Sequence, residues 1–321
     1  MKKTLIVALK VIVSSTIMYL LLRGMDMRAF LKTVVSVSPF AVIGAMLFII
    51  CIQCVSTLRW SIILKKDVDV PYLKLFSIYF IGMFFNNFLP TLVGGDIIKG
   101  YYLYKASGKG GVALASVFMD RYAGFSALIV IALGALIMGH ALIAGTGLAF
   151  ALILLIFGYA AGSLILWVDL FNSRVMRLLA RVQFYQLNEK IDKFYKVLMS
   201  YRDHRRLLLK AFFCSLIVQA GVIVVYYFIA LGLGMKVPMA YFFLFIPLTT
   251  AASMLPISVS GLGIREGVFV FLFTKAGATE EQALSLSLIF FFIAVFISLI
   301  GAVEYIRSGT PKGHIIEEEG L

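Results

Sequence analysis

Two short stretches of this apolar chain carry charged side chains beside helix-breaking residues. The first, "LPTLVGGDIIKG", starts at Leu89 and places Gly94, Gly95, Asp96 and Lys99 close together. A helix that restarts after the two glycines offers free backbone N–H groups and a positive dipole end. Because Lys99 follows in the same stretch, the pattern predicts a site for an anionic ligand.

The second stretch, "LPISVSGLGIREG" from Leu255, repeats the first without a gap. In this alignment Gly95 matches Gly261 and Lys99 matches Arg265, so we expect the two cations to reach the same anion. The candidate substrate-binding residues of the two stretches are Pro90, Gly94, Gly95, Asp96 and Lys99 in the first, and Pro256, Ser258, Ser260, Gly261, Gly263, Arg265 and Glu266 in the second.

Acidic and amide side chains beside the breaks have more than one interpretation. Asp96 and Glu266 could cap the restarting helices, pair with the neighbouring cations, or carry a coupled proton. Asn86 and Asn87 precede the first break, where they could cap the broken backbone or bind a polar headgroup. All four are candidate site residues.

Other intramembrane charges are few. Asp120 and Arg121 lie inside an apolar run, where charge is costly unless it is paired or wetted. A local ion pair and a place against a cavity are both open, and we favour the cavity. Arg59 and Trp60 are expected at the inner face, where arginine snorkels and tryptophan anchors. The second-tier site candidates are Arg59, Gln219 and Tyr226.

The amino-acid composition indicates the fold class of the protein. The 321 residues are 62% hydrophobic and 14% charged, with a mean hydropathy of +1.01, so lipid is the solvent and the fold class is an all-α polytopic membrane protein. The net charge of +13 is scattered between apolar runs, which indicates anionic headgroups and cytoplasmic loops rather than nucleic acid. The three cysteines and three histidines form no ligand motif, so we expect no metal and no cofactor.

Apolar runs predict about six full spans, and the two broken regions predict two re-entrant helical hairpins, an eight-helix type of fold. Three spans and one hairpin in each half make an inverted repeat. If each hairpin arm spans instead, the chain has up to ten helices. The full spans are expected near 4–22, 39–58, 112–137, 141–168, 207–232 and 280–305.

The chain is expected to divide into two membrane repeats and a tail. The first repeat is 1–137 and contains a cytoplasmic-side hairpin at 72–105. The second repeat is 138–306 and contains an external-side hairpin at 238–275, and the cytoplasmic tail is 307–321.

Lysine and arginine set the orientation. The segment 169–206 is rich in both, which predicts that it and both termini are cytoplasmic in a multi-pass protein of the cell membrane. Apolar residues recur at helical spacing near its end, at Ile191, Phe194, Tyr195 and Leu198. The segment is therefore either a basic amphipathic helix on the inner leaflet or a linker helix packed on neighbouring loops.

The stretches "LRWSIIL", "FFNNFLPTLVGGDIIKGYYL", "MDRYAG" and "LPISVSGLGIREGVFVFLF" together resemble the family named for the membrane region of lysylphosphatidylglycerol synthases, over about 5–305. The resemblance implies a stand-alone translocator without the aminoacyl-transferase domain. It also implies an acidic residue before the arginine, which is Asp120 here. A second acidic position that it implies is occupied by Gly124.

These observations lead us to expect a flippase- or scramblase-like lipid translocase, and not an enzyme. Its substrate would be an anionic phospholipid or a polyisoprenyl-phosphate-type lipid. A secondary transporter of a small soluble anion uses the same architecture and stays open, and an intramembrane glycosyl or prenyl transferase is a third reading. The expected partner is a membrane lipid with an anionic headgroup, with a homo-oligomer or an envelope-biosynthesis enzyme as further options.

Overall fold

The computed structural model describes residues 2–23, 25–89, 93–138, 148–167, 194, 196–254, 258 and 261–308. Within these residues the chain forms helices and no strand, which confirms the all-α prediction. The helices are α1 (Lys2–Arg23), α2 (Met27–Val35), α3 (Pro39–Leu64), α4 (Tyr72–Phe88), α5 (Gly94–Ser107), α6 (Gly110–Met138), α8 (Leu148–Trp167), the 3₁₀ turn η1 (Tyr201–Asp203), α11 (Arg205–Gly232), α12 (Met239–Ser253), α13 (Ile264–Lys275) and α14 (Glu280–Arg307).

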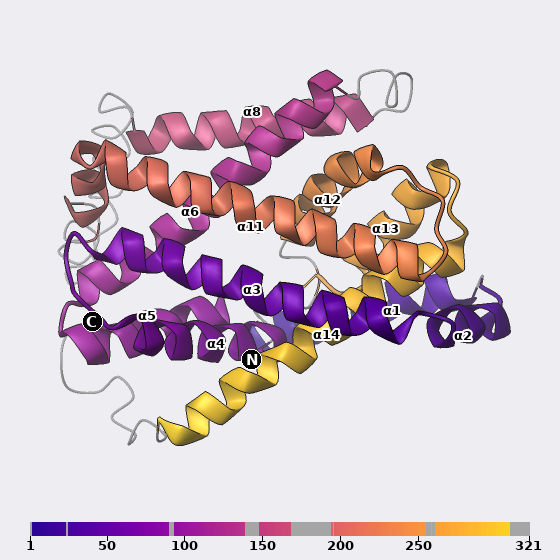
Figure 1. Ribbon diagram of the computed structural model, residues 1–321, viewed down its shortest axis with the longest axis horizontal. Helices are drawn as coiled ribbons and strands as arrows, with labels where there is room; N and C mark the ends of the chain where they lie inside the picture. Colours follow the sequence, from indigo (N-terminus) through magenta and orange to yellow (C-terminus); the bar gives the residue numbers. More distant parts are fainter. Residues whose placement is uncertain are drawn as a thin grey trace.

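Among the described residues, four helices are long and apolar enough to cross a membrane: α3, α6, α11 and α14. They coincide with four of the six expected spans, and the other two expected spans fall on α1 and α8. The long helices run along the longest axis of the molecule, and α8 packs outside α6 (Figure 1). A multi-pass helical membrane protein is therefore confirmed.

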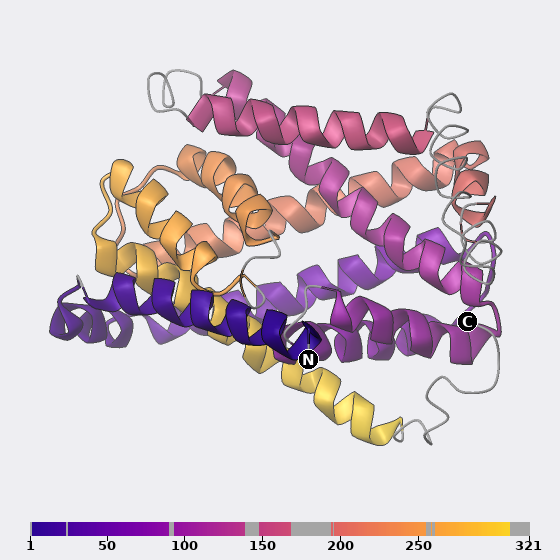
Figure 2. The same cartoon turned by 180° about the vertical axis from the view of Figure 1, so that it is seen from behind.

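Both broken regions form a pair of helices. α4 ends at Phe88 and α5 begins at Gly94, whereas α12 ends at Ser253 and α13 begins at Ile264. The two members of each pair pack side by side, and the α4–α5 pair lies at the opposite end of the molecule from the α12–α13 pair (Figures 1 and 2). This is the arrangement expected of two hairpins. Their entry from opposite membrane faces, and the inverted repeat itself, stay predictions.

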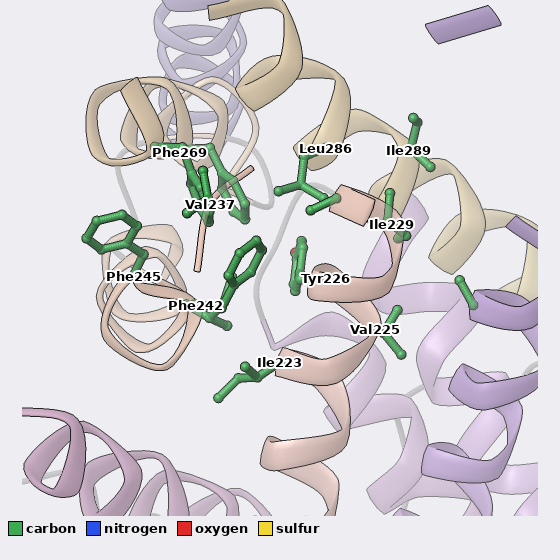
Figure 3. Close-up of a cluster of buried hydrophobic side chains, with 14 of the residues drawn as sticks. Ile223, Val225, Tyr226, Ile229, Val237, Phe242, Phe245, Phe269, Leu286 and Ile289 are labelled. Carbon is green, nitrogen blue, oxygen red and sulfur yellow. The ribbon is translucent and has the colours of Figure 1, made fainter. Parts of the chain in front are cut away.

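An aromatic core holds the second pair in place. Figure 3 shows Tyr226 of α11, Phe242 of α12, Phe269 of α13 and Leu286 of α14 pointing into one cluster. All four are nearly or fully buried. Because these residues come from four helices, the cluster fixes the position of the α12–α13 pair against α11 and α14.

Close helix crossings hold the first pair. A Cβ atom built on Gly95 of α5 would lie 1.9 Å from the carbonyl oxygen of Gly82 of α4, and one on Gly301 of α14 would lie 2.0 Å from that of Phe80. Real Cβ atoms never approach so closely, so both crossings require glycine. The backbones of α5, α4 and α14 are therefore in direct contact around the first break.

The expected end of the second span was wrong. α3 continues past residue 58 to Leu64, so Arg59 and Trp60 lie inside the helix instead of at its end. Both are buried, and the indole N–H of Trp60 donates to Ser116 Oγ at 3.2 Å. Neither side chain snorkels or anchors, because both have polar partners on neighbouring helices within the protein.

Only part of the basic segment 169–206 falls within the described residues. Leu198 and Tyr201 are buried there, in a cluster with Ile63 of α3 and Met119 of α6. This end of the segment therefore packs on neighbouring helices, as the linker alternative expects. Residues 168–193 and Tyr195, and the tail beyond residue 308, lie outside the described part.

Candidate functional site

Three helices bring a carboxylate and two cations together beside the first break. Asp120 of α6 accepts a hydrogen bond from Arg59 Nε of α3 at 2.8 Å on one oxygen, and from Lys99 Nζ of α5 at 3.2 Å on the other. Arg59 also donates from Nη1 to Ser215 Oγ of α11 at 3.1 Å. The Asp120 side chain is only 3% exposed. One carboxylate thus pairs with two buried cations, and this pairing lowers the free-energy cost of placing charged groups at membrane depth.

Aromatic rings fix the position of Lys99. Its ammonium nitrogen lies 3.9 Å from the ring centre of Tyr79 and 4.6 Å from that of Trp60, so cation–π attraction adds to the pairing with Asp120. Its aliphatic part packs on Gly82, where a built Cβ would lie 2.3 Å from Lys99 Cγ. The Lys99 side chain is 5% exposed. The position of this cation is therefore fixed by a carboxylate, two aromatic rings and a close helix contact.

A second ion pair completes the cluster. Arg121 Nε of α6 donates to Asp96 Oδ2 of α5 at 2.7 Å. The N-cap position of α5 is Val93, which makes no side-chain cap, so Asp96 pairs with a cation instead of capping the helix. Asp96 is nearly buried, whereas the side chain of Arg121 is 44% exposed. Of the three cations, Arg121 has the most exposed side chain.

The two asparagines before the break have different surroundings. Asn86 Oδ1 accepts a hydrogen bond from the backbone N–H of Gly95 at 2.9 Å, so Asn86 caps the broken backbone. The amide nitrogen of Asn87 is buried and has no hydrogen-bond partner among the described residues. A buried donor without a partner costs free energy, so Asn87 offers a hydrogen bond to a ligand.

These side chains line a cavity of about 310 Å³. It lies at mid-height of the helices, because Asp120 and Gly124 are near the middle of α6 and Gln219 is near the middle of α11. Gln219 Nε2 donates to the carbonyl oxygen of Gly124 at 3.1 Å. The charged lining residues are Arg59, Lys99, Arg121, Asp96 and Asp120, and the apolar ones include Ile52, Met83, Phe125, Leu128, Val218, Val222 and Met254.

The lining of this cavity combines charged, neutral polar and apolar side chains. Three cations against two carboxylates leave a surplus of one positive charge. The neutral polar lining residues are Gln53, Ser56, Asn86, Asn87, Gln219 and Thr250, and most of the others are aliphatic or aromatic. A cavity of this kind suits a ligand with an anionic group and an adjoining apolar part.

Glycine at position 124 leaves room for this arrangement. A Cβ built on Gly124 would lie 3.4 Å from Arg59 Nη1, which is close to ordinary van der Waals contact, so a longer side chain would lie against the guanidinium. The acidic residue that the family resemblance implied at this position is absent, and the carboxylate partner of Arg59 is Asp120.

The second break has a cluster of its own. Glu266 is fully buried, accepts from the backbone N–H of Gly263 at 2.7 Å and from Arg265 Nε at 2.9 Å, and so caps α13 as one reading expected. Ser287 Oγ of α14 lies 3.2 Å from Glu266 Oε1. The guanidinium of Arg265 stacks on the ring of Phe291 at 4.7 Å. This cluster is neutral and satisfied by its own members.

The structure gathers one half of the expected site and leaves the other half apart. Asn86, Asn87, Asp96, Lys99, Asp120 and Arg121 line the cavity, together with Arg59 and Gln219 from the second tier. Gly94 and Gly95 form the start of α5. Gly261, Gly263, Arg265 and Glu266 belong to the second break, Tyr226 to the aromatic core, and Ser258 is buried with its hydroxyl unpartnered among the described residues.

Three expected site residues, Pro90, Pro256 and Ser260, lie outside the described part of the chain. The idea that Lys99 and Arg265 share one anion is not what the structure shows, because each cation has a different carboxylate partner and only Lys99 lines the cavity. Asp120 and Arg121, in turn, pair with residues of other helices and not with each other.

Sequence reasoning missed Tyr79, Trp60 and Ser215 as members of the site. Tyr79 precedes Asn86 by seven residues, so helical spacing alone would have placed it on the face of α4 that carries the asparagine. Nothing in the sequence marks Ser215, which reaches Arg59 from a helix more than 150 residues later.

Comparison with known proteins decides the family. Residues 7–301 match the family described as "Lysylphosphatidylglycerol synthase TM region". The chain belongs to this family. It is 25% identical over 294 residues to a UPF0104 membrane protein of Pyrococcus horikoshii, covering 82% of this chain and 86% of the relative. It is 26% identical over 278 residues to a UPF0104 membrane protein of Methanothermobacter thermautotrophicus, covering 78% and 79%.

No solved structure matches this chain. The family match spans all four helices that are long and apolar enough to cross a membrane, except the last turns of α14. It also contains both breaks and the whole cavity lining. The protein is thus a multi-pass membrane protein of a family related to membrane lipids, and its cavity lies within the region that defines the family.

Proposed function

We propose that this protein is a translocase that moves a lipid with an anionic headgroup between the two leaflets of a membrane, and that it performs no covalent chemistry. The substrate class is an anionic phospholipid or a polyisoprenyl-phosphate-type lipid. The observation that carries the proposal is the cavity at mid-height of the helices, whose lining combines a surplus of one positive charge with many apolar side chains. A lipid phosphate and the start of its chain have this same polarity.

Arg121 is the cation that we expect to bind the headgroup. Arg59 and Lys99 are nearly buried and both pair with Asp120, so either cation would have to break a buried ion pair to turn to a ligand. Arg121 is more exposed and has one carboxylate partner, Asp96. A phosphate oxygen that replaces Asp96 at the guanidinium would keep a charge-assisted hydrogen bond in place of the one lost.

Asn87 supplies a neutral donor beside this cation. Asn87 lines the cavity and its amide nitrogen has no partner among the described side chains and backbone groups, so we expect a phosphate oxygen to accept a hydrogen bond from it. Arg59 and Lys99 would contribute the positive potential of the site at a fixed distance. The headgroup would thus exchange one contact during passage while the Arg59–Asp120–Lys99 group stays intact.

The apolar side chains of the cavity lining favour a lipid translocase over a transporter of a soluble anion. Met83, Phe125 and Leu128 would lose contact with water against a lipid chain but would gain nothing from a small hydrated anion. The exposed outer faces of α3 and α14 carry further large apolar residues, which places lipid directly around the helices.

Leaflet exchange in proteoliposomes tests the proposal. We expect the wild type to speed exchange of fluorescent phosphatidylglycerol over that of phosphatidylcholine. Arg121→Gln should slow this exchange by roughly 5- to 100-fold, the scale of about 1–3 kcal/mol for a charged hydrogen bond. The matched control is Arg307→Gln, which removes an exposed, paired arginine at the end of α14. Uptake of labelled glycerol 3-phosphate without lipid exchange, or equal rates for both lipids, would contradict the proposal.

A further inference from the structure

A second cavity, about 550 Å³, lies where α3 ends and α11 begins. This place is at one end of the long helices, away from the mid-height cavity (Figure 1). Four cations line it: Lys65, Arg205, Arg206 and Lys210. All four are exposed, and none is within ion-pair distance of a carboxylate among the residues that the structure describes.

The remaining lining residues do not balance this charge. Asp203 is the one carboxylate of the lining, and His204 uses Nδ1 in a 2.9 Å hydrogen bond with the carbonyl oxygen of Ser200. Ile62 and Leu207 complete the wall. The lining therefore carries four cations against one carboxylate, together with two apolar side chains.

Apolar side chains continue from these cations into the membrane span. On α11, Phe213 and Ile217 follow Lys210 at helical spacing, and each is 60% exposed. On α3, Leu58 precedes Ile62 by one turn on the same face and is exposed as well. Both helices are among those long and apolar enough to cross a membrane, and they pack against each other. The cations at the ends of these two helices are thus followed directly, along the same helices, by exposed apolar side chains.

We propose that this groove, formed by Ile62, Lys65, Arg205, Arg206 and Lys210, holds a resident anionic phospholipid that is not the transported substrate. The two guanidinium groups and two ammonium groups would bind the phosphate of the headgroup, and the acyl chains would lie along Leu58 and Phe213. Basic grooves at the cytoplasmic ends of membrane helices meet the anionic leaflet, and positive-inside orientation predicts that this end is cytoplasmic.

The apolar continuation is the reason to choose a lipid. A free phosphate or a soluble phosphorylated compound would gain from the cations but would make no use of Phe213 or Leu58. A phospholipid engages both surfaces at once, because its phosphate and its chains belong to one molecule and Phe213 follows Lys210 by one turn of α11. This inference does not rest on the proposed transport function, since the two cavities share no lining residue.

Native mass spectrometry of the full-length protein tests this site. The protein, purified in a neutral detergent, is titrated with phosphatidylglycerol and with phosphatidylcholine. We expect one tightly bound phosphatidylglycerol in the wild type, and binding at least tenfold weaker in the double variant Arg206→Gln/Lys210→Gln. The control is Lys236→Gln/Lys275→Gln, which removes two exposed cations from the opposite end of the molecule and should bind like the wild type.

Two further measurements separate lipid from free anion. Phe213→Gln keeps every cation but removes an exposed apolar contact, so it should weaken phosphatidylglycerol binding severalfold. Inorganic phosphate at millimolar concentration should fail to displace the lipid. The proposal is wrong if the two double variants lose phosphatidylglycerol equally, if phosphatidylcholine binds as tightly as phosphatidylglycerol, or if inorganic phosphate displaces the lipid and Phe213→Gln has no effect.

Discussion

At the first break Lys99 meets a carboxylate from another helix, whereas at the second break Arg265 meets the carboxylate of the residue beside it, Glu266. The two cations occupy matching positions of the repeated sequence, yet their surroundings differ. Asp120 of α6 also pairs with Arg59 of α3, so the first break is tied into a network of three helices. At the second break the charges of Arg265 and Glu266 cancel within α13, and both side chains contact Ser287 of α14.

The position of the carboxylate decides what each break can do. Around Lys99, five ionic side chains line a cavity and leave a net positive charge beside an apolar wall. Around Arg265, the guanidinium is covered by Phe291 and the carboxylate caps the helix, so little remains for a ligand. The repeated sequence thus has one break whose ionic side chains line a cavity and one whose ionic side chains pair with each other at the start of α13.

The largest expected difference between the breaks concerns their carboxylates. Asp120→Asn should lower the free energy of unfolding by about 3–5 kcal/mol, because it leaves Arg59 and Lys99 buried without a counter-charge. Glu266→Gln should cost less, about 1–3 kcal/mol, since the glutamine oxygen can still accept from Gly263. Reversible unfolding in mixed detergent and SDS micelles measures both. Equal losses would mean that the network around Asp120 is no more important than a helix cap.

A smaller difference is expected at the matched glycines. Gly95→Ala should destabilise by about 1–3 kcal/mol, because the new Cβ would meet the carbonyl oxygen of Gly82 and push α5 away from α4. Gly261→Ala meets Ser253 at 3.0 Å and has a φ of +80°, which costs about 1–2 kcal/mol.

The control for both glycine variants is Gly134→Ala on α6, where a built Cβ has no neighbour within 4 Å. This variant should unfold like the wild type, and the same SDS titration measures it. If Gly95→Ala is as harmless as Gly134→Ala, the close crossing of α4 and α5 is not required for folding.

Much of this comparison could be predicted from the sequence, and part of it could not. The breaks after Phe88 and Ser253 follow from proline and glycine in otherwise apolar runs, and the cavity residues Asp96, Lys99 and Asp120 stand out as rare intramembrane charge. The role of Arg59 could not be predicted, because its partner Asp120 is 61 residues away and pairing between helices depends on packing. Local signals therefore located the charges but not their partners.

The repeat itself misled the site prediction in one respect. Matching positions suggested that Lys99 and Arg265 act on one ligand, but a sequence match carries no information about which neighbouring helix supplies the counter-charge. At Arg265 the adjacent Glu266 is available at once, and Lys99 has glycine at the matching position, Gly100. In the same alignment Asp120 matches Leu286, so the second copy also lacks the distant carboxylate that pairs with Lys99.

A moderate gain is expected from Asp96→Asn. The carboxylate of Asp96 competes with an anionic headgroup for Arg121, so its removal should strengthen binding. We expect the mole fraction of phosphatidylglycerol that gives half-maximal exchange to fall about fivefold, which corresponds to about 1 kcal/mol. Exchange in proteoliposomes at several phosphatidylglycerol fractions measures this. A higher half-maximal fraction in Asp96→Asn would show that Asp96 assists the ligand instead of competing with it.

The smallest effect on lipid dependence is expected for a variant at the second break. This variant tests whether only the first break binds the headgroup. Arg265→Gln removes a cation that lies outside the cavity lining and is already paired with Glu266, so it takes no contact from a headgroup in the cavity. The half-maximal phosphatidylglycerol fraction should therefore change less than twofold, even though the loss of contacts with Glu266 and Phe291 lowers stability.

Exchange of phosphatidylglycerol by Arg265→Gln must be normalised to the amount of folded protein, with Arg121→Gln measured beside it. Under that normalisation a stability defect reduces the number of active molecules but leaves their lipid dependence unchanged, whereas a lost ligand contact shifts the lipid dependence itself. If Arg265→Gln shifts the half-maximal fraction as far as Arg121→Gln does, both breaks bind the headgroup. The two clusters would then bind one anion in succession. The structure gives Arg121 and Arg265 different carboxylate partners, and Arg265 does not line the cavity that contains Arg121.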